Sequence, residues 1–212
     1  MMAHSFVKWL DARTGLLTTL NQKKAQAVPA HMSFFYCFGG ISLLIILMQL
    51  VTGIYMTFYY APHPHEALRS IEAMSNGSVT GAMMRNMHRW GSTLLLATLF
   101  SHMITVVLHK AYRNPRELNW LSGVFQFILV VLLLATGLIL PWDWRAYWSF
   151  AIWADYLESW PLVGSWLKNA LLDHFTINRG FVLHVLILPA LLGILLNFHF
   201  RMVRRHGIAG PL

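Results

Sequence analysis

HRWGSTLLLATLFSH, residues 88–102, is an apolar stretch with a histidine at each end, and residues 184–199, HVLILPALLGILLNFH, form a second stretch of the same kind. The histidines of the first pair are 14 residues apart and those of the second pair 15. At about 1.5 Å rise per residue, either spacing covers about 21 Å and close to four turns of an α-helix. The two histidines of a pair therefore face roughly the same way, at two depths of one helix.

The composition around these stretches is typical of a membrane protein. Of the 212 residues, 57% are hydrophobic and 11% are charged, whereas about 25% of an ordinary soluble domain is charged. The apolar residues gather in four runs, each near the ~20 residues that a membrane-spanning helix needs. The expected spans are residues 33–58, 82–110, a third from Asn114-Pro115 to Leu140-Pro141, and 180–205.

The segments between and before these runs are more polar. Residues 1–30 alternate aromatic and aliphatic residues with charges, which predicts an amphipathic surface segment, and residues 31–212 form the predicted four-helix domain. Residues 60–80 contain Pro and Gly and are expected to be a loop. Residues 144–172 are rich in Trp, Tyr and Leu, which predicts helices along the membrane surface, broken near Pro161 and Gly164. The predicted fold class is an all-α integral membrane protein, a four-transmembrane-helix bundle with peripheral surface helices.

The net charge of +8 is distributed unevenly over this topology. Four spans place both termini and the loop around 110–117 on one side, which carries ten Lys and Arg residues against two acidic residues. The opposite side carries six of each. The positive-inside rule therefore predicts both termini on the cytoplasmic, electrically negative side. This asymmetry accounts for the basic pI, and nucleic-acid binding is not expected.

The topology pairs the histidines by depth: His88 with His184 near the outer face, and His102 with His199 near the inner face. Ionisable side chains at membrane depth are costly and usually functional. Each pair can supply both axial nitrogens to one haem iron, which predicts two bis-histidine haem b sites. Such iron has no open position, so it passes electrons and binds no substrate. The alternative is that lone intramembrane histidines hydrogen-bond across helices, in a haem-free transporter or scaffold.

Two pairs of glycines repeat the 14-residue spacing: Gly39 with Gly53 and Gly123 with Gly137. Glycine weakens a helix, so its presence needs a reason. We expect each glycine to leave room for a porphyrin edge, although close packing between helices also uses small residues. Arg85 and Arg89 flank His88, and we expect them to pair with haem propionates or to anchor the helix at the membrane interface.

Several short motifs carry a resemblance to the cytochrome b6 family, the four-helix cytochrome b subunits of b6f and split bacterial bc complexes. The resemblance covers residues from about 29 to the C-terminus, and the 15-residue step from His184 to His199 is similar to the b6 type. The motifs are Tyr36-Cys37-Phe38-Gly39-Gly40-Ile41, Met56-Thr57-Phe58-Tyr59-Tyr60, His88-Arg89-Trp90, Asn114-Pro115-Arg116-Glu117-Leu118, Leu140-Pro141-Trp142-Asp143 and Gly207-Ile208-Ala209-Gly210-Pro211-Leu212.

The resemblance implies a subunit of a quinol:cytochrome c or plastocyanin oxidoreductase. Such a complex runs a proton-translocating Q cycle, with quinone or quinol as substrate. The implied partners are subunit IV, a Rieske iron–sulfur protein and a c-type cytochrome, in a dimeric complex. The catalytic Pro-Glu-Trp-Tyr element lies on subunit IV in split systems, so this chain is not expected to be active alone. The implied location is a bacterial cell membrane or a thylakoid.

The resemblance also implies roles for particular residues. Cys37 matches the cysteine that holds a covalent c-type haem at the inner quinone site, and Arg204 falls where the family has a basic residue near that haem. The outer quinol site is implied to include Trp142, Tyr147 and Arg179. On spacing alone, the favoured explanation of Cys37 is a small buried hydrophobe, and the matched Tyr-Cys-Phe-Gly-Gly motif favours haem attachment instead.

A second family class with four helices and bis-histidine haems stays open at this point. It is the dihaem cytochrome b membrane anchor of a quinone-linked dehydrogenase or hydrogenase, which works without a Rieske partner. The paired glycines and the Pro-Trp-Asp and Pro-Arg-Glu-Leu motifs favour the b6 interpretation.

Overall fold

The computed structural model describes residues 11–13, 34–171 and 175–207. The chain divides into two compact units, residues 1–33 and residues 34–212. In the first unit, residues 11–13 are helical, and the rest of the predicted amphipathic segment 1–30 lies outside the described residues. So does most of the C-terminal motif, residues 208–212.

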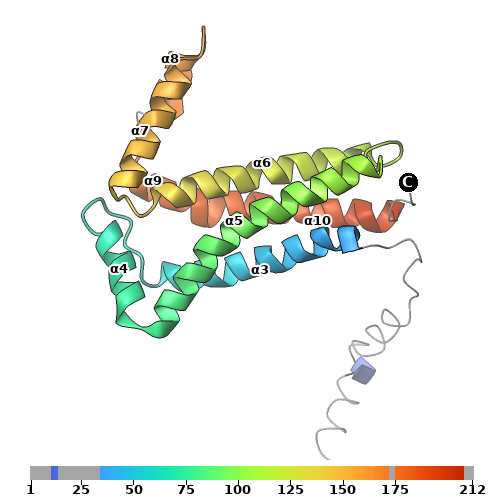
Figure 1. Cartoon of the computed structure of the whole chain (residues 1–212), viewed down its shortest axis with the longest axis horizontal. Helices are drawn as coiled ribbons and strands as arrows, with labels where there is room; N and C mark the ends of the chain where they lie inside the picture. Colours follow the sequence, from blue (N-terminus) through green and yellow to red (C-terminus); the bar gives the residue numbers. More distant parts are fainter. Residues whose placement is uncertain (1–10, 14–33, 172–174, 208–212) are drawn as a thin grey trace, which may run out of the picture. The chain divides into compact units, whose positions relative to one another are not determined.

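Four long helical spans build the second unit (Figure 1). They are α3 (Phe38–Thr57), α5 (Val79–Leu108), α6 (Glu117–Ile139) and a composite span of α9 (Ile177–Val182), η2 (Leu183–Ile187) and α10 (Leu188–His206). A short 3₁₀ turn, η1 (Phe34–Cys37), leads into α3. All four spans are long and apolar enough to cross a membrane. The predicted class, an all-helical multi-pass membrane protein, is confirmed.

The four spans pack as two pairs joined through their centre. α3 packs against α5, α10 packs against α6, and α5 contacts α6. One buried side chain from each span meets in a central cluster of Ile45, Leu95, Val130 and Leu192. Each cluster residue lies midway along its helix between the two glycines or the two histidines. An apolar layer therefore separates the two histidine depths.

Many other large apolar side chains of these spans are exposed, among them Leu44, Val51 and Ile194. A water-soluble protein rarely exposes so many large apolar side chains. Facing lipid, the same surface needs no cover, because lipid tails are as apolar as leucine. The exposed faces therefore agree with membrane insertion.

The sequence predicted a loop over residues 60–80, but this segment contains the helix α4 (Ala67–Gly77). Its buried residues Ala67, Ile71 and Met74 are spaced four and three apart. That spacing places them on one face of the helix, and α4 packs with α5. The prolines and Gly77 that favoured a loop lie at or outside the ends of this helix, where they are compatible with it.

Tyr60 joins three spans at the end of the bundle that carries α4. Its hydroxyl donates a hydrogen bond to the Leu140 carbonyl oxygen at 2.7 Å, and its ring stacks on Phe181 with centroids 5.4 Å apart. Burial raises the pKa of Tyr60, so the phenol stays protonated and remains a donor. The ends of α3, α6 and α9 are thereby held together.

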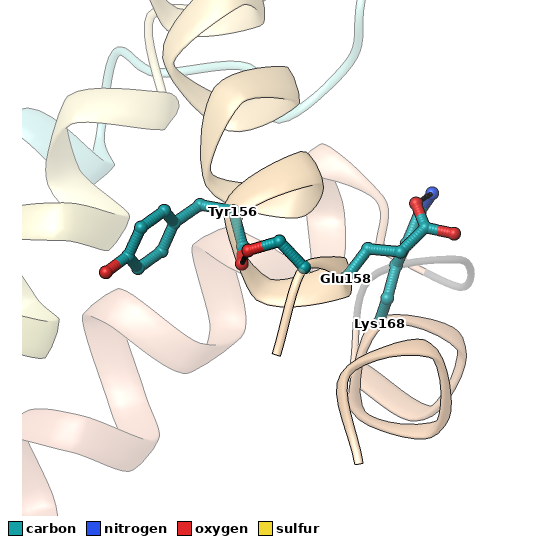
Figure 2. Close-up of polar contacts among 4 residues, drawn as sticks. Tyr156, Glu158 and Lys168 are labelled. Carbon is teal, nitrogen blue, oxygen red and sulfur yellow. Dashed lines mark hydrogen bonds and ion pairs between the residues drawn. The ribbon is translucent and has the colours of Figure 1, made fainter. Parts of the chain in front are cut away.

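The predicted surface helices are α7 (Trp144–Glu158) and α8 (Gly164–Leu171). Asp143 caps α7 by accepting a hydrogen bond from the Ala146 N–H at 2.8 Å. The break predicted near Pro161 and Gly164 is confirmed. Figure 2 shows Lys168 of α8 reaching the carboxylate of Glu158 at the end of α7, an ion pair that joins the two helices.

Candidate cofactor-binding site

The four histidines predicted as metal ligands lie on facing helices of the bundle. His88 and His102 are on α5, His184 is in η2 and His199 is on α10. The rings of His88 and His184 have centroids 6.2 Å apart with planes at 70°. His102 and His199 lie near enough to interact electrostatically. The structure thus brings together the two pairs that the sequence predicted.

The separation of the first pair fits one metal ion held between two imidazoles. A metal–nitrogen bond of about 2 Å on each side, plus about 1.1 Å from each ring centre to its nitrogen, gives about 6.2 Å. A bare zinc site needs three or four protein ligands. Among the described residues, no three His, Cys, Asp or Glu side chains gather in this way. Two histidines suffice for a haem iron, because the porphyrin supplies the other four nitrogens.

A π-helical turn places His184 in register. In η2 the Leu188 N–H donates to the Leu183 carbonyl oxygen, five residues back. Pro189 follows at the start of α10 and has no N–H to continue the usual pattern. In a regular α-helix, a step of 15 residues rotates about 60° more than four full turns, and a step of 14 residues rotates about 40° less. Without an irregularity, His199 would therefore face a different direction relative to His184 than His102 does relative to His88. One residue absorbed in the π-turn makes the step from His184 to His199 equivalent to that from His88 to His102.

Each predicted glycine lies against one histidine ring. A Cβ added to Gly53 would lie 3.2 Å from His88 Cε1, and one added to Gly137 would lie 2.9 Å from His184 Cε1. At the other depth, a Cβ added to Gly39 would lie 3.0 Å from His102 Cε1, and one added to Gly123 would lie 3.6 Å from His199 Cε1. Real Cβ atoms rarely approach within 3.4 Å. A Cβ at Gly137 would force the His184 ring to move, and one at Gly39 or Gly53 would push its ring by a few tenths of an ångström. α3 and α6 therefore cradle the rings of α5, η2 and α10.

Three hydroxyl groups that were not predicted from the sequence contact the histidines. Thr52 Oγ1 lies 3.0 Å from His88 Nδ1, Thr136 Oγ1 lies 2.9 Å from His184 Nδ1, and Ser122 Oγ lies 2.9 Å from His199 Nδ1. Each hydroxyl residue immediately precedes the glycine that faces the same ring. A Ser/Thr-Gly dipeptide repeated at the glycine spacing was the signal that could have revealed them.

The hydroxyl contacts favour one tautomer of each imidazole. Each hydroxyl donates its single hydrogen to a backbone carbonyl oxygen: Thr52 to Met48 at 2.7 Å, Thr136 to Leu132 at 2.8 Å, and Ser122 to Asn119 at 2.8 Å. With the hydroxyl hydrogen on the carbonyl oxygen, the imidazole is the donor in the other contact and carries its hydrogen on Nδ1. Nε2 keeps its lone pair, as a metal-binding histidine requires.

The arginines that the sequence suggested as partners of haem groups lie at the ends of the bundle. Arg85 donates to Ser75 Oγ of α4 at 3.2 Å, so its side chain is tied to α4. Arg89 is exposed one residue beyond His88, and Arg204 is exposed near the end of α10. Cys37 ends η1 and is exposed, which disagrees with the alternative that it is a small buried hydrophobe.

Two of the three residues suggested for the outer quinol site lie together. Trp142, which precedes α7, makes an edge-to-face contact with Tyr147 at 6.3 Å between ring centroids. Arg179 lies exposed on α9, and no described contact joins it to either ring. Phe150 and Phe175, with centroids 4.8 Å apart, connect α7 with the residues that lead into α9.

Comparison with known proteins agrees with this geometry. Residues 23–207 match the family described as Cytochrome b/b6/petB. The menaquinol:cytochrome c reductase cytochrome b subunit of Bacillus subtilis (strain 168) is 34% identical over 224 residues, covering 100% of both chains. The cytochrome b6 of Cyanidium caldarium is 38% identical over 212 residues, covering 98% of this chain and 99% of that one.

A solved structure has the same fold. A chain of a structure titled "Hyperthermophilic respiratory Complex III" superimposes with a TM-score of 0.86 and 26% identity. The match covers 95% of this chain and 55% of that longer chain. Family match, full-length relatives and fold agree, and the chain therefore belongs to the cytochrome b/b6 family.

Proposed function

We propose that this chain is the dihaem cytochrome b subunit of a quinol:cytochrome c or plastocyanin oxidoreductase, which carries electrons across the membrane in a proton-translocating Q cycle. The observation that carries the proposal is the double cradle, in which two depths of one bundle each hold two facing histidines and two glycines. The relatives named menaquinol:cytochrome c reductase subunit and cytochrome b6 support the same assignment.

In this proposal one haem b is held by His88 and His184, and the other by His102 and His199. Bound haem supplies one-electron redox chemistry at each depth. The protein supplies the rest: Nε2 lone pairs as ligands, glycine gaps beside the rings, and the apolar layer between the two depths. Arg89, exposed beside His88, is available to a propionate, whereas Arg85 reaches one only if it leaves Ser75.

The proposed orientation places both termini on the cytoplasmic or electrically negative side, because the Lys and Arg residues gather there. The His88–His184 pair is then nearer the outer face and the His102–His199 pair nearer the inner face. Trp142 and Tyr147, near the His88–His184 end, are the proposed contribution of this chain to the outer quinol site, together with Arg179. The catalytic element on subunit IV completes that site, so the isolated chain is not expected to oxidise quinol.

We further propose that Cys37 holds a third, c-type haem through one thioether bond. Its support is the motif Tyr36-Cys37-Phe38-Gly39-Gly40 and the exposure of the thiol two residues before Gly39, which faces His102. A covalent haem survives denaturation, whereas axial coordination is lost. The purified complex should therefore show a haem-stained band near 24.3 kDa on a denaturing gel, and Cys37→Ser should abolish that band. An unstained wild-type band would contradict the proposal.

Purification through a tag on this chain tests the proposed complex. A Rieske iron–sulfur protein, subunit IV and a c-type cytochrome are expected to co-purify, in a dimeric assembly that reduces cytochrome c or plastocyanin with quinol. The dihaem anchor of a dehydrogenase or hydrogenase is the competing function, and it predicts a dehydrogenase subunit in place of the Rieske protein. The absence of a b-type α band from the reduced-minus-oxidised spectrum would remove both redox functions.

A further inference from the structure

The two histidine pairs differ in their hydrogen bonds. Both rings of the His88–His184 pair have a hydroxyl at Nδ1, from Thr52 and Thr136. In the His102–His199 pair only His199 has one, from Ser122. No described residue makes a hydrogen bond to the His102 ring. Among the described residues, three of the four imidazoles therefore have a hydroxyl partner at Nδ1, and His102 has none.

The reason for the difference lies in the residue before each glycine. Thr52, Ser122 and Thr136 precede Gly53, Gly123 and Gly137, and each contacts the histidine that its glycine faces. Gly39 faces His102 at the same kind of distance, but Phe38 precedes it. A phenyl ring has no lone pair to accept the Nδ1 hydrogen. Three positions of a fourfold pattern carry a hydroxyl, and the fourth carries a hydrocarbon.

A hydroxyl that accepts from Nδ1–H makes the imidazole a stronger electron donor through Nε2. A stronger donor stabilises ferric iron more than ferrous iron, so it lowers the reduction potential of a haem that it ligates. Hydrogen bonding around the ligands is one of the means by which a protein sets such potentials. The hydroxyls are suited to this role because their own hydrogens are committed to backbone carbonyl oxygens.

We infer that Thr52, Thr136 and Ser122 are positioning residues that set the two haem potentials unequally. Two hydroxyls lower the potential at His88–His184, and one lowers it at His102–His199. The inference rests on the proposed dihaem function. It adds that part of the potential difference is encoded by which residue precedes each glycine.

Redox titration of the α band of the purified complex tests the inference. Thr136→Val and Thr52→Val should each raise the potential of the His88–His184 haem only, and narrow the gap between the two haems. Ser122→Ala should raise the potential of the other haem only, and widen the gap. We expect a roughly tenfold change in the reduction equilibrium for each hydroxyl, which is about 59 mV for one electron.

The matched control is Thr98→Val. Thr98 is buried in the same bundle, and its hydroxyl accepts a hydrogen bond from Ser42 Oγ at 3.1 Å instead of contacting a histidine Nδ1, so both potentials should stay unchanged. The reverse change, Phe38→Ser, should lower the potential of the His102–His199 haem. Unchanged potentials in all three hydroxyl variants, or shifts of the same size in Thr98→Val, would overturn the inference.

Failure of the proposed function gives a different result. If the wild-type protein binds no b haem, there is no potential to titrate, and the dihaem proposal itself fails. If two b haems titrate and the hydroxyl variants do not change their reduction potentials, the dihaem function stands and only the inference about the hydroxyl groups is wrong.

Discussion

Replacing His184 by alanine is expected to remove one b haem and leave the other in place. In our assignment His184 Nε2 would be one of the two protein ligands to the iron of this haem, with His88 as the other. Without it, the b-haem content of the purified complex should fall by about half, since one of two ligand pairs is lost. Quinol oxidation through the complex should stop. Pyridine haemochrome analysis and the redox-resolved α band measure both haems.

The pairing makes this prediction specific. His88→Ala should remove the same haem as His184→Ala, and His102→Ala and His199→Ala should both remove the other. His65→Ala is the matched control, because His65 is an exposed loop histidine and should leave both haems bound. Normal haem content in His184→Ala, or a different haem lost in His88→Ala, would show that these rings do not share one iron.

The glycine cradle gives the second large effect. Leucine at position 137 would place its Cβ 2.9 Å from His184 Cε1, with further atoms beyond it. Overpacking of this kind typically costs about 1–3 kcal/mol when neighbours can move, and here it displaces a proposed ligand. We expect Gly137→Leu to lose the His88–His184 haem, as measured by the same α-band titration.

Gly193→Leu is the matched control, since it lies on the same span and nothing is within 4 Å of its added Cβ. For the smaller change to alanine, the loss of haem binding should increase as the distance from the added Cβ to the histidine ring decreases. Alanine should disturb haem binding most at Gly137 and Gly39, less at Gly53 and least at Gly123, where 3.6 Å is ordinary contact. If Gly123→Ala or Gly193→Leu proved the most damaging, the close contacts would not explain why glycine is there.

Much of the fold could be predicted because the features that determine it, apolar runs and residue spacings, can be read along the sequence and occur more than once. Four apolar runs predict four spans, and matched spacings of histidine and glycine predict which faces meet. The start of α5 at Val79 rather than residue 82 shows the limit of hydropathy. The first turns of α5 are more polar than the rest, and the Ser78 side chain caps them by accepting from the Gly81 N–H at 2.9 Å.

Other features could not be predicted because they depend on partners from distant parts of the chain. α4 is short, and only its packing with α5 shows that Ala67, Ile71 and Met74 form a buried face. The π-turn at Leu183–Ile187 reconciles a 15-residue step with a 14-residue one, which spacing alone left unexplained. Ser and Thr also serve helix packing in membranes, so only the distances to Nδ1 distinguish Thr52, Ser122 and Thr136.

The central claim is that two irons lie within the bundle, one between His88 and His184 and one between His102 and His199. An anomalous difference map recorded at the iron edge from crystals of the intact complex tests it most directly. The account predicts a peak between the Nε2 atoms of each pair, on either side of the layer formed by Ile45, Leu95, Val130 and Leu192. Iron peaks elsewhere with none between these rings, or density for only one of the two, would contradict it.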